Sequence, residues 1–356
     1  MALSKNAIYL VTDARILKLA LAQAQHLAKQ WDCDVHLFVQ DDSIISLPRL
    51  DDPRVKLRLN EIEQVFPDNL PQFAQWPLTV FQLMVAPDYL DAYDRVLHLD
   101  VDVLSLKADP SLWELELETG LGAVANAATL TTSPRDQDLD RDAWLAGIGV
   151  TKGRYFNAGI LLIDPKRWNS AAIPEALRRY YDTYHLQGIN SQDFLNHLYD
   201  GRWTELSPRW NFQPQLFELG LEDQLDPVFL HFCGRFKPWY FPGFPGESNH
   251  RVEHENAFFQ IVSAAGFRPE EVSEVGNVRQ WRRKRRPVRK LLSRIGIRQK
   301  KEREARRIWA ERRRAMPRYL ADAVASGTFV DPIEFDPERL APARVRFDGR
   351  NVRLLK

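Results

Sequence analysis

Two aspartates, Asp100 and Asp102, directly follow the apolar run from Arg95 to Leu99. Such a run is typical of a buried strand, and where the chain leaves the strand both carboxylates can turn toward one divalent cation. The chain has four other Asp-x-Asp pairs, and the motif alone fits a solvated surface pair better than a metal site. Only this copy follows an apolar strand, which predicts a cation that holds a diphosphate at the carboxyl edge of a sheet.

A second candidate site is the stretch His-Phe-Cys-Gly-Arg-Phe-Lys-Pro-Trp at residues 231–239. His231 at a strand end can complete a metal site with two carboxylates, because imidazole and carboxylate groups both bind divalent metals. Gly234 would let the backbone approach a phosphate closely, and Lys237 would bring a positive charge to it. The alternative at this point is a strand capped by a hydrogen-bonded histidine.

A third candidate is the triplet Asn157-Ala158-Gly159, which precedes an apolar run at 160–163. Small residues beside an amide fit the close approach of a ligand that carries hydroxyl groups, such as a sugar. A tight turn that leads into a core strand would explain the same residues, and this alternative stays open here.

A fourth candidate lies at the start of a predicted helix, where Gln192 and Asp193 follow Ser191. Ser191 can cap the helix, and the next two side chains would then point toward a polar site. Helix capping alone also explains this stretch.

The elements that must position these side chains follow the pattern of a layered α/β domain. Predicted strands cover residues 7–12, 35–39, 95–99, 122–124, 160–163 and 228–232. Predicted helices cover about three turns from Leu17, then 173–184 and 192–199. No glycine-rich phosphate turn follows the first strand, which excludes a P-loop and a dinucleotide fingerprint.

The composition narrows the class of protein. The chain has 356 residues, of which 44% are hydrophobic and 27% charged, a length that fits about two domains. No run approaches the ~18 apolar residues of a spanning helix. The apolar run at 7–12 is too short for the core of a signal peptide, so we expect a cytoplasmic protein. Two cysteines, Cys33 and Cys233, are too few for a disulfide framework or a cysteine zinc cage.

The charge is divided unevenly along the chain. Residues 277–318 contain 19 Lys and Arg against three acids, a net charge of +16, which leaves −15 elsewhere because the whole chain carries +1. We therefore predict two parts, a catalytic domain over 1–275 and a basic extension over 276–356, with irregular structure in the last forty residues. A basic amphipathic segment favours an anionic membrane surface as its partner. A nucleic-acid-binding arm and a solvated helix are the alternatives.

The order and spacing of these motifs resemble glycosyltransferase family 8 over about residues 6–239. The shared features are the strand that ends in Asp-x-Asp, Phe-Asn-Ala-Gly-Ile-Leu-Leu-Ile-Asp at 156–164, Gln-Asp-Phe-Leu-Asn at 192–196, Trp-Asn-Phe at 210–212 and His-Phe-x-Gly-x-x-Lys-Pro-Trp at 231–239. The family includes lipopolysaccharide galactosyl- and glucosyltransferases and the glycogenins. It implies a GT-A fold, a Rossmann-like α/β domain whose mixed sheet binds a nucleotide sugar, here with a basic helical extension.

The resemblance implies a metal-dependent hexosyltransferase that retains anomeric configuration. The expected donor is UDP-glucose or UDP-galactose, and the expected acceptor is a cell-surface glycan or a lipid-linked molecule. The expected ion is Mn²⁺, with Mg²⁺ as the alternative. Together with the basic extension, this predicts a peripheral protein at the inner face of the cytoplasmic membrane. A non-catalytic protein that binds nucleotide sugars or nucleic acid is the alternative function.

Carried over residue by residue, the resemblance implies three groups of site residues. The metal ligands are Asp100, Asp102 and His231. The donor-binding residues are Asp13, Arg15, Asp100, Asn157, Ala158, Gly159, Gly234 and Lys237. The catalytic residues are Gln192, beneath the anomeric carbon, and Asp193. The chain departs from the family at three positions: Arg15 replaces a tyrosine that stacks on uracil, Gln82 an arginine, and Ser191 an acid that contacts the sugar. The donor sugar and base therefore stay open.

Overall fold

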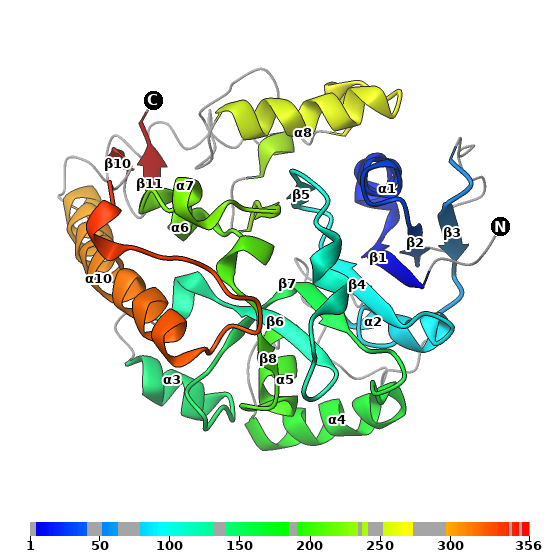
Figure 1. The fold of residues 1–356 in the computed structure, drawn as a ribbon, viewed down its shortest axis with the longest axis horizontal. Helices are drawn as coiled ribbons and strands as arrows, with labels where there is room; N and C mark the ends of the chain where they lie inside the picture. The colour runs from blue at the N-terminus through cyan, green and yellow to red at the C-terminus, as the bar shows by residue number, and fades with distance from the viewer. Residues whose placement is uncertain are drawn as a thin grey trace.

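The computed structural model describes residues 5–40, 52–62, 79–131, 140–184, 191–233, 237–240, 252–272, 297–341, 344–348 and 351–355. Within these ranges a seven-stranded sheet lies between helices on both of its faces (Figure 1). Its strands are β1 (Asn6–Thr12), β2 (Asp34–Val39), β3 (Val55–Leu59), β4 (Arg95–Leu99), β6 (Leu121–Ala125), β7 (Phe156–Ile163) and β8 (Thr204–Glu205). Two short pairs stand apart from it, β5 (Val103–Ser105) with β9 (Phe229–His231), and β10 (Val345–Asp348) with β11 (Asn351–Leu354).

The strand order in the large sheet is β3-β2-β1-β4-β7-β6-β8. Strands β1, β2, β3 and β4 run parallel, whereas β7 is antiparallel to both of its neighbours, β4 and β6. The carboxyl ends of β1 and β4 therefore meet the amino end of β7 at one edge of the sheet. This edge receives the polar residues that follow β1 and β4.

Helices α1 (Leu17–Trp31) and α8 (Val252–Ala264) lie on one face of the sheet. Helices α2 (Thr79–Gln82), α4 (Ile173–Tyr184) and α5 (Ser191–Leu198) lie on the other. Helix α4 packs on the sheet because its buried residues Ile173, Leu177 and Tyr180 recur at helical spacing and form one apolar face. The remaining described helices are α3 (Arg141–Gly147), α6 (Pro214–Glu218), α7 (Glu222–Leu225) and α10 (Ile297–Ser326).

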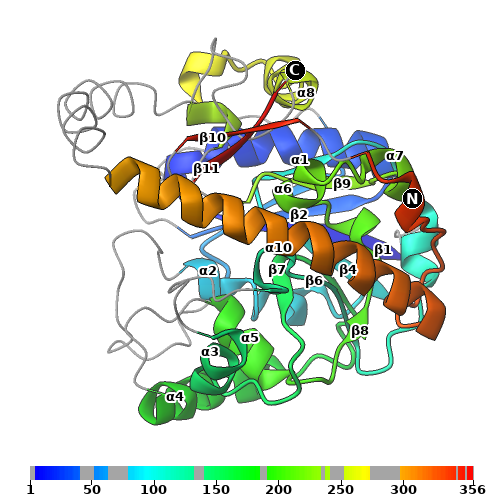
Figure 2. The same ribbon diagram turned by 90° about the vertical axis from the view of Figure 1, so that its left-hand side faces the viewer.

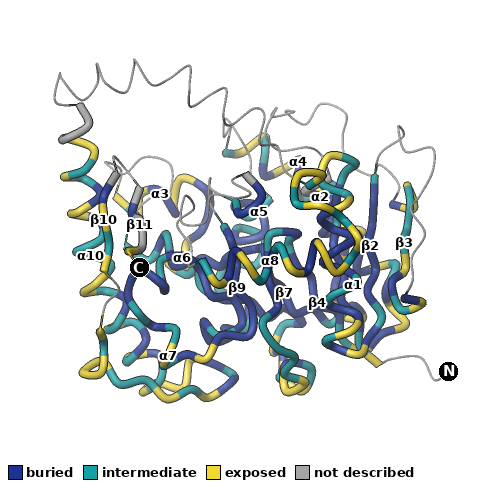
Figure 3. Tube along the Cα trace, turned by 90° about the horizontal axis from the view of Figure 1, so that it is seen from above, coloured by how far each residue is buried: buried dark blue, intermediate teal, exposed yellow. Residues whose placement is uncertain are grey.

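The strands and helices predicted from apolar periodicity are confirmed. The strand at 95–99 and the helix at 173–184 have the predicted bounds. The strand predicted at 160–163 begins earlier, at Phe156, and all eight of its residues are buried (Figure 3). The sequence analysis missed β3, whose residues Val55, Leu57 and Leu59 alternate with Lys56 and Arg58. The edge position of β3 explains this mixed composition, since only one of its sides pairs with another strand.

The expectation of irregular structure in the last forty residues is wrong for 317–326, 345–348 and 351–354. Helix α10 continues through Pro317 to Ser326, and β10 and β11 form a hairpin beyond it. A proline inside a helix usually ends it. Here Met316 and Leu320 are buried in the main hydrophobic core, and this packing outweighs the local cost. The predicted boundary at residue 275 lies outside the described residues.

A buried carboxylate fastens the segment after α10 to the rest of the molecule. Asp331 accepts hydrogen bonds from the Ser207 amide (2.8 Å), the Ser207 hydroxyl (2.5 Å) and the Trp210 indole Nε1 (2.8 Å). The Val330 amide donates to the Glu205 carbonyl at 3.0 Å, which continues the attachment. Helix α10 crosses the body of the protein (Figure 2), so it is an integral part of the fold. Among the described helices, none combines the length and hydrophobicity needed to cross a bilayer.

We expect Asp331→Ala to lower the free energy of unfolding by about 3 kcal/mol, because each buried donor that loses its acceptor costs about 1–3 kcal/mol. Urea denaturation followed by tryptophan fluorescence measures the change. The control is Asp322→Ala, which removes an exposed carboxylate on α10 that pairs with Arg318 at 3.6 Å. This control should change stability by no more than about 0.5 kcal/mol. Equal midpoints for the wild type and Asp331→Ala would contradict the expectation.

Candidate active site

Two strand pairings bring Asp100, Asp102 and His231 together. Asp100 directly follows β4 at the carboxyl edge of the large sheet, and Asp102 directly precedes β5. The pairing of β5 with β9 sets His231 opposite Val103, next to Asp102. His231 Nε2 lies 3.3 Å from Asp102 Oδ1 and 3.8 Å from Asp100 Oδ2. The structure thus brings the three predicted metal ligands within 4.8 Å of one another.

A buried asparagine fixes the orientation of the His231 ring. Asn211 Nδ2 donates to Asn157 Oδ1 at 2.9 Å, so Asn211 Oδ1 is the atom that faces His231 Nδ1, at 3.1 Å. An amide oxygen only accepts, and His231 Nδ1 must therefore carry the proton. In the neutral imidazole, Nε2 then presents its lone pair to two carboxylates. This arrangement is favourable when a positive charge lies among the three groups.

Lys237 supplies positive charge to the same cluster. Its Nζ contacts Asp102 Oδ2 and donates to the Phe232 carbonyl at 2.9 Å. Burial alone would raise the pKa of Asp102, but the positive charge of Lys237 and its hydrogen bond to the carboxylate outweigh it and hold that pKa well below its usual range. Burial would lower the pKa of Lys237, and Asp102 more than reverses this, so the net shift is upward. Both groups are therefore charged at neutral pH.

Gly159 leaves the space that the cluster needs. A Cβ at this position would lie 2.3 Å from His231 Cε1 and 2.7 Å from Asp100 Oδ2, both far inside van der Waals contact. The Asp100 amide donates to the Gly159 carbonyl at 2.8 Å, which ties the two strands together at this point. The predicted residues Asn157 and Gly159 thus border the cluster, and no larger residue than glycine fits at 159.

Helix α5 is held against β7 by side-chain amides. Gln192 Oε1 accepts from the Ala158 amide at 3.0 Å, and Gln192 Nε2 donates to the Tyr155 hydroxyl at 2.9 Å. That hydroxyl donates to Asp193 Oδ1 at 2.6 Å, and the Asp193 side chain points into the protein, since the residue is only 2% exposed. Gln192 therefore lies beside the strand that borders the cluster, whereas Asp193 anchors α5 behind it.

The sequence analysis gave no role to two buried amides, Asn211 and Asn196. Asn196 Oδ1 accepts from the Phe156 amide at 2.7 Å, and its Nδ2 donates to the Phe156 carbonyl at 2.9 Å. Both asparagines stand in apolar stretches, Asn211 between Trp210 and Phe212. A buried amide must find hydrogen-bond partners, so an asparagine among aromatic residues was the available signal.

Asp13 and Arg15 lie at the same sheet edge as Asp100, because β1 and β4 are parallel neighbours. Arg15 Nε and Nη2 both donate to Asp13 Oδ2, at 2.9 and 2.6 Å, and the Arg15 side chain is 58% exposed. Gly234, the remaining predicted donor-binding residue, lies outside the described residues.

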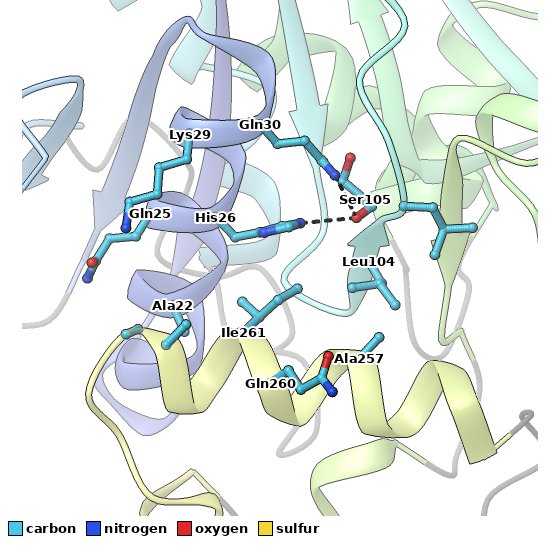
Figure 4. Close-up of a pocket in the computed structure, with 13 residues that line it drawn as sticks. Ala22, Gln25, His26, Lys29, Gln30, Leu104, Ser105, Ala257, Gln260 and Ile261 are labelled. Atoms are coloured by element: carbon cyan, nitrogen blue, oxygen red, sulfur yellow. Dashed lines mark hydrogen bonds between the residues drawn. The ribbon is translucent and has the colours of Figure 1, made fainter.

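A groove of about 330 Å³ runs between α1 and α8 (Figure 4). Leu104 and Ile261 contribute to its apolar lining, and His26 and Gln30 both reach the Ser105 carbonyl, at 3.1 and 3.5 Å. None of the predicted site residues lines this groove. The chemistry of the predicted residues is concentrated at the sheet edge instead.

The chain is similar to known glycosyltransferases. The model of "Glycosyl transferase family 8" matches residues 15–241, which is more than half of the chain. General stress protein A of Bacillus subtilis is 27% identical over 195 residues, covering 50% of this chain and 62% of the relative. Lipopolysaccharide 1,3-galactosyltransferase of Salmonella typhimurium is 30% identical over 183 residues, covering 48% and 52%. Lipopolysaccharide 1,2-glucosyltransferase of Escherichia coli is 25% identical over 189 residues, also covering 48% and 52%. The chain thus spans about half to three fifths of the length of these curated relatives.

Among solved structures, the galactosyltransferase LgtC in complex with donor and acceptor sugar analogs has a TM-score of 0.56. Its sequence identity is 21%, and the match covers 75% of this chain and 98% of LgtC. This likeness shows the fold, and the predicted α/β architecture of GT-A type is confirmed by it. With the family model matched over the residues that build the sheet edge, the chain belongs to glycosyltransferase family 8.

Proposed function

We propose that this chain is a metal-dependent hexosyltransferase. It moves glucose or galactose from a nucleoside-diphosphate sugar, with UDP as the expected nucleotide, to a cell-surface glycan or lipid-linked acceptor, and it retains the anomeric configuration. The observation that carries the proposal is the cluster of Asp100, Asp102 and His231 at the carboxyl edge of the sheet. Two of the relatives transfer galactose or glucose to lipopolysaccharide, which supports a hexose as the transferred group.

The ligand atoms of the cluster fit a divalent cation. Two carboxylates offer oxygen, and His231 offers the bare nitrogen Nε2 because its Nδ1–H donates a hydrogen bond to Asn211. Asp100, Asp102 and His231 would hold the ion, and a mixed oxygen and nitrogen set suits Mn²⁺ better than Mg²⁺, which prefers oxygen. When bound, such an ion acts as a Lewis acid on the leaving diphosphate.

The chain's own residues prepare the rest of the reaction. Lys237, held against Asp102, brings a second positive charge to the leaving diphosphate in a partly buried site. Gln192 presents its amide dipole beside Ala158, and a glutamine also belongs to the active site of LgtC. Asp193 is buried and already accepts a hydrogen bond from the Tyr155 hydroxyl. Both features disfavour Asp193 as a nucleophile.

We therefore infer front-face attack by the acceptor hydroxyl. The oxygen–carbon bond to the acceptor forms as the bond to the diphosphate breaks, and the leaving phosphate oxygen takes the hydroxyl proton. No carboxylate pair straddling the bond, as in glycosidases, is required. Mass spectrometry that trapped a covalent glycosyl adduct on Asp193 or Gln192 would contradict this mechanism.

The donor is tested by measuring nucleotide release from a panel of nucleoside-diphosphate sugars with Mn²⁺, before any acceptor is known. We expect slow hydrolysis of UDP-glucose or UDP-galactose, because water can replace the acceptor hydroxyl. Chelation with EDTA should abolish the release, and added Mn²⁺ should restore it. Folded protein that released no nucleotide from any donor, with Mn²⁺ or with Mg²⁺, would sink the proposal.

We expect Asp102→Asn to lower metal-dependent turnover at least about 100-fold, since loss of a metal ligand removes several kcal/mol of leaving-group stabilisation. The variant should remain folded, because an amide of equal size replaces the carboxylate. Asp94→Asn is the matched control, since Asp94 is exposed and pairs only at the surface with Lys166, at 2.8 Å. Near-normal turnover of Asp102→Asn would show that the metal assignment is wrong.

The location of the protein is also a proposal. Apolar residues of helix α10 are buried, and the exposed residues of its described part are mostly basic. These are Lys300, Lys301, Arg303, Arg306, Arg307, Arg313, Arg314 and Arg318. Because Ile308 and Leu320 are buried in the protein, α10 would bind an anionic membrane through charge and not through insertion. We propose a peripheral location at the cytoplasmic face of the membrane.

The surface charge of α10 is tested by replacing Lys300, Lys301, Arg303 and Arg314 together with glutamine. Each basic residue near an anionic surface contributes about 1 kcal/mol, so we expect at least a tenfold lower affinity for vesicles that contain phosphatidylglycerol. The control variant removes four exposed charges elsewhere, at Lys29, Lys56, Lys152 and Arg179.

Binding of the wild type should weaken as NaCl is raised, because salt screens exposed charges. Equal vesicle flotation of both variants and the wild type would contradict the proposed location. Binding of the wild type to DNA but not to vesicles would favour the nucleic-acid alternative instead.

A further inference from the structure

A second histidine, His98, lies beside the cluster. It stands two residues before Asp100, on strand β4, where side chains at this spacing leave the same face. Its Nε2 is 3.3 Å from Asp100 Oδ1, and the residue is only 2% exposed. The sequence analysis gave this side chain no role. Its presence in the strand therefore needs a separate explanation.

The hydrogen bond defines the proton on the His98 ring. A carboxylate only accepts, so Nε2 must donate, and Nδ1 is then the bare nitrogen of a neutral imidazole. Nδ1 is buried and finds no hydrogen-bond partner among the described residues. The ring also packs on Tyr9 from the neighbouring strand, with ring centroids 5.0 Å apart. A buried nitrogen without a partner is unfavourable, and an apolar ring would fill this place without that cost.

The contact to Asp100 explains why a histidine stands there. Asp102 is held by Lys237, and His231 is held by Asn211. Asp100 has the most exposed side chain of the three, at 45%, and solvent alone would leave its carboxylate free to rotate. His98 holds Oδ1, which leaves Oδ2 as the oxygen that faces His231, at 3.8 Å. Each of the three candidate ligands therefore has one side chain behind it.

We propose that His98 is a positioning residue of the metal site: it fixes the Asp100 carboxylate so that one oxygen points toward the space shared with Asp102 and His231. The proposal rests on the proposed metal-dependent function. It assigns His98 no contact with the donor and no transfer of a proton. His98 would strengthen binding of the metal ion by ordering Asp100 before the ion arrives, since ligands that are already in place lose less freedom on binding.

The test compares the affinity of the full chain for Mn²⁺ alone, measured by electron paramagnetic resonance of free Mn²⁺, without nucleotide. We expect His98→Phe to weaken Mn²⁺ binding about tenfold or more, the usual effect of losing a group behind a metal ligand. His98→Gln should stay within about threefold of the wild type, because the glutamine Nε2 reaches the place of the histidine Nε2. His98→Asn should resemble the phenylalanine variant, because its shorter amide does not reach Asp100.

Two measurements separate positioning from a structural role. Without metal, His98→Phe and His98→Gln should have similar midpoints of thermal unfolding. His36→Gln is the control, because His36 is another buried strand histidine, bonded to Tyr93 and Arg58, whose loss should lower stability without changing Mn²⁺ affinity. Where His98→Phe fails to fold, the comparison of His98→Gln with His98→Asn decides alone.

Equal Mn²⁺ affinities of His98→Gln and His98→Asn, or of folded His98→Phe and the wild type, would overturn the role of His98. If Asp102→Asn still weakened binding in that experiment, the proposed metal site would stand. A wild type that bound neither Mn²⁺ nor Mg²⁺ would overturn both proposals, and it would be recognised before any His98 variant was made.

Discussion

Two carboxylates that face one imidazole nitrogen repel it and each other unless positive charge lies among them, and the site is built around this constraint. Lys237 supplies part of this positive charge through its contact with Asp102. The His231 tautomer adds to the need for positive charge, since Nδ1–H donates a hydrogen bond to Asn211 Oδ1 and the lone pair of Nε2 therefore faces the two carboxylates. Gly159 keeps the intervening space open. The cluster is thus held in an arrangement that a cation would stabilise.

A series of hydrogen bonds links the carboxy-terminal part of the chain to the cluster. Asp331 fixes the turn at Ser207 and Trp210, and the next residue, Asn211, fixes His231. Helix α10 lies between these parts in sequence and contributes Met316 and Leu320 to the core. Its basic face therefore belongs to a helix that packs on the body of the protein. A surface that binds α10 would consequently set the orientation of the whole molecule toward its acceptor.

Short-range patterns predicted much of this architecture, and contacts between distant residues account for what was missed. The strand at 95–99 and the acids after it could be predicted because apolar periodicity and Asp-x-Asp are local signals. His231 could be assigned only through the order of several motifs. The roles of Asn211 and Asp331 depend on partners 20 and 124 residues away, which no local pattern indicates. The continuation of α10 through Pro317 likewise depends on tertiary packing, which local rules leave out.

At the predicted base-binding end of the site, a departure from the family pattern can preserve a physical property. Where the family resemblance implies a stacking tyrosine, this chain has Arg15, whose guanidinium is held along one edge by Asp13. A guanidinium bonded at its edge still offers its flat face, and planar cations stack on aromatic rings. The pairing also neutralises most of the added charge, so the change adds little attraction for phosphate. Selection of the base at this position would then depend on the shape and hydrogen-bonding edge of the ring and not on net charge.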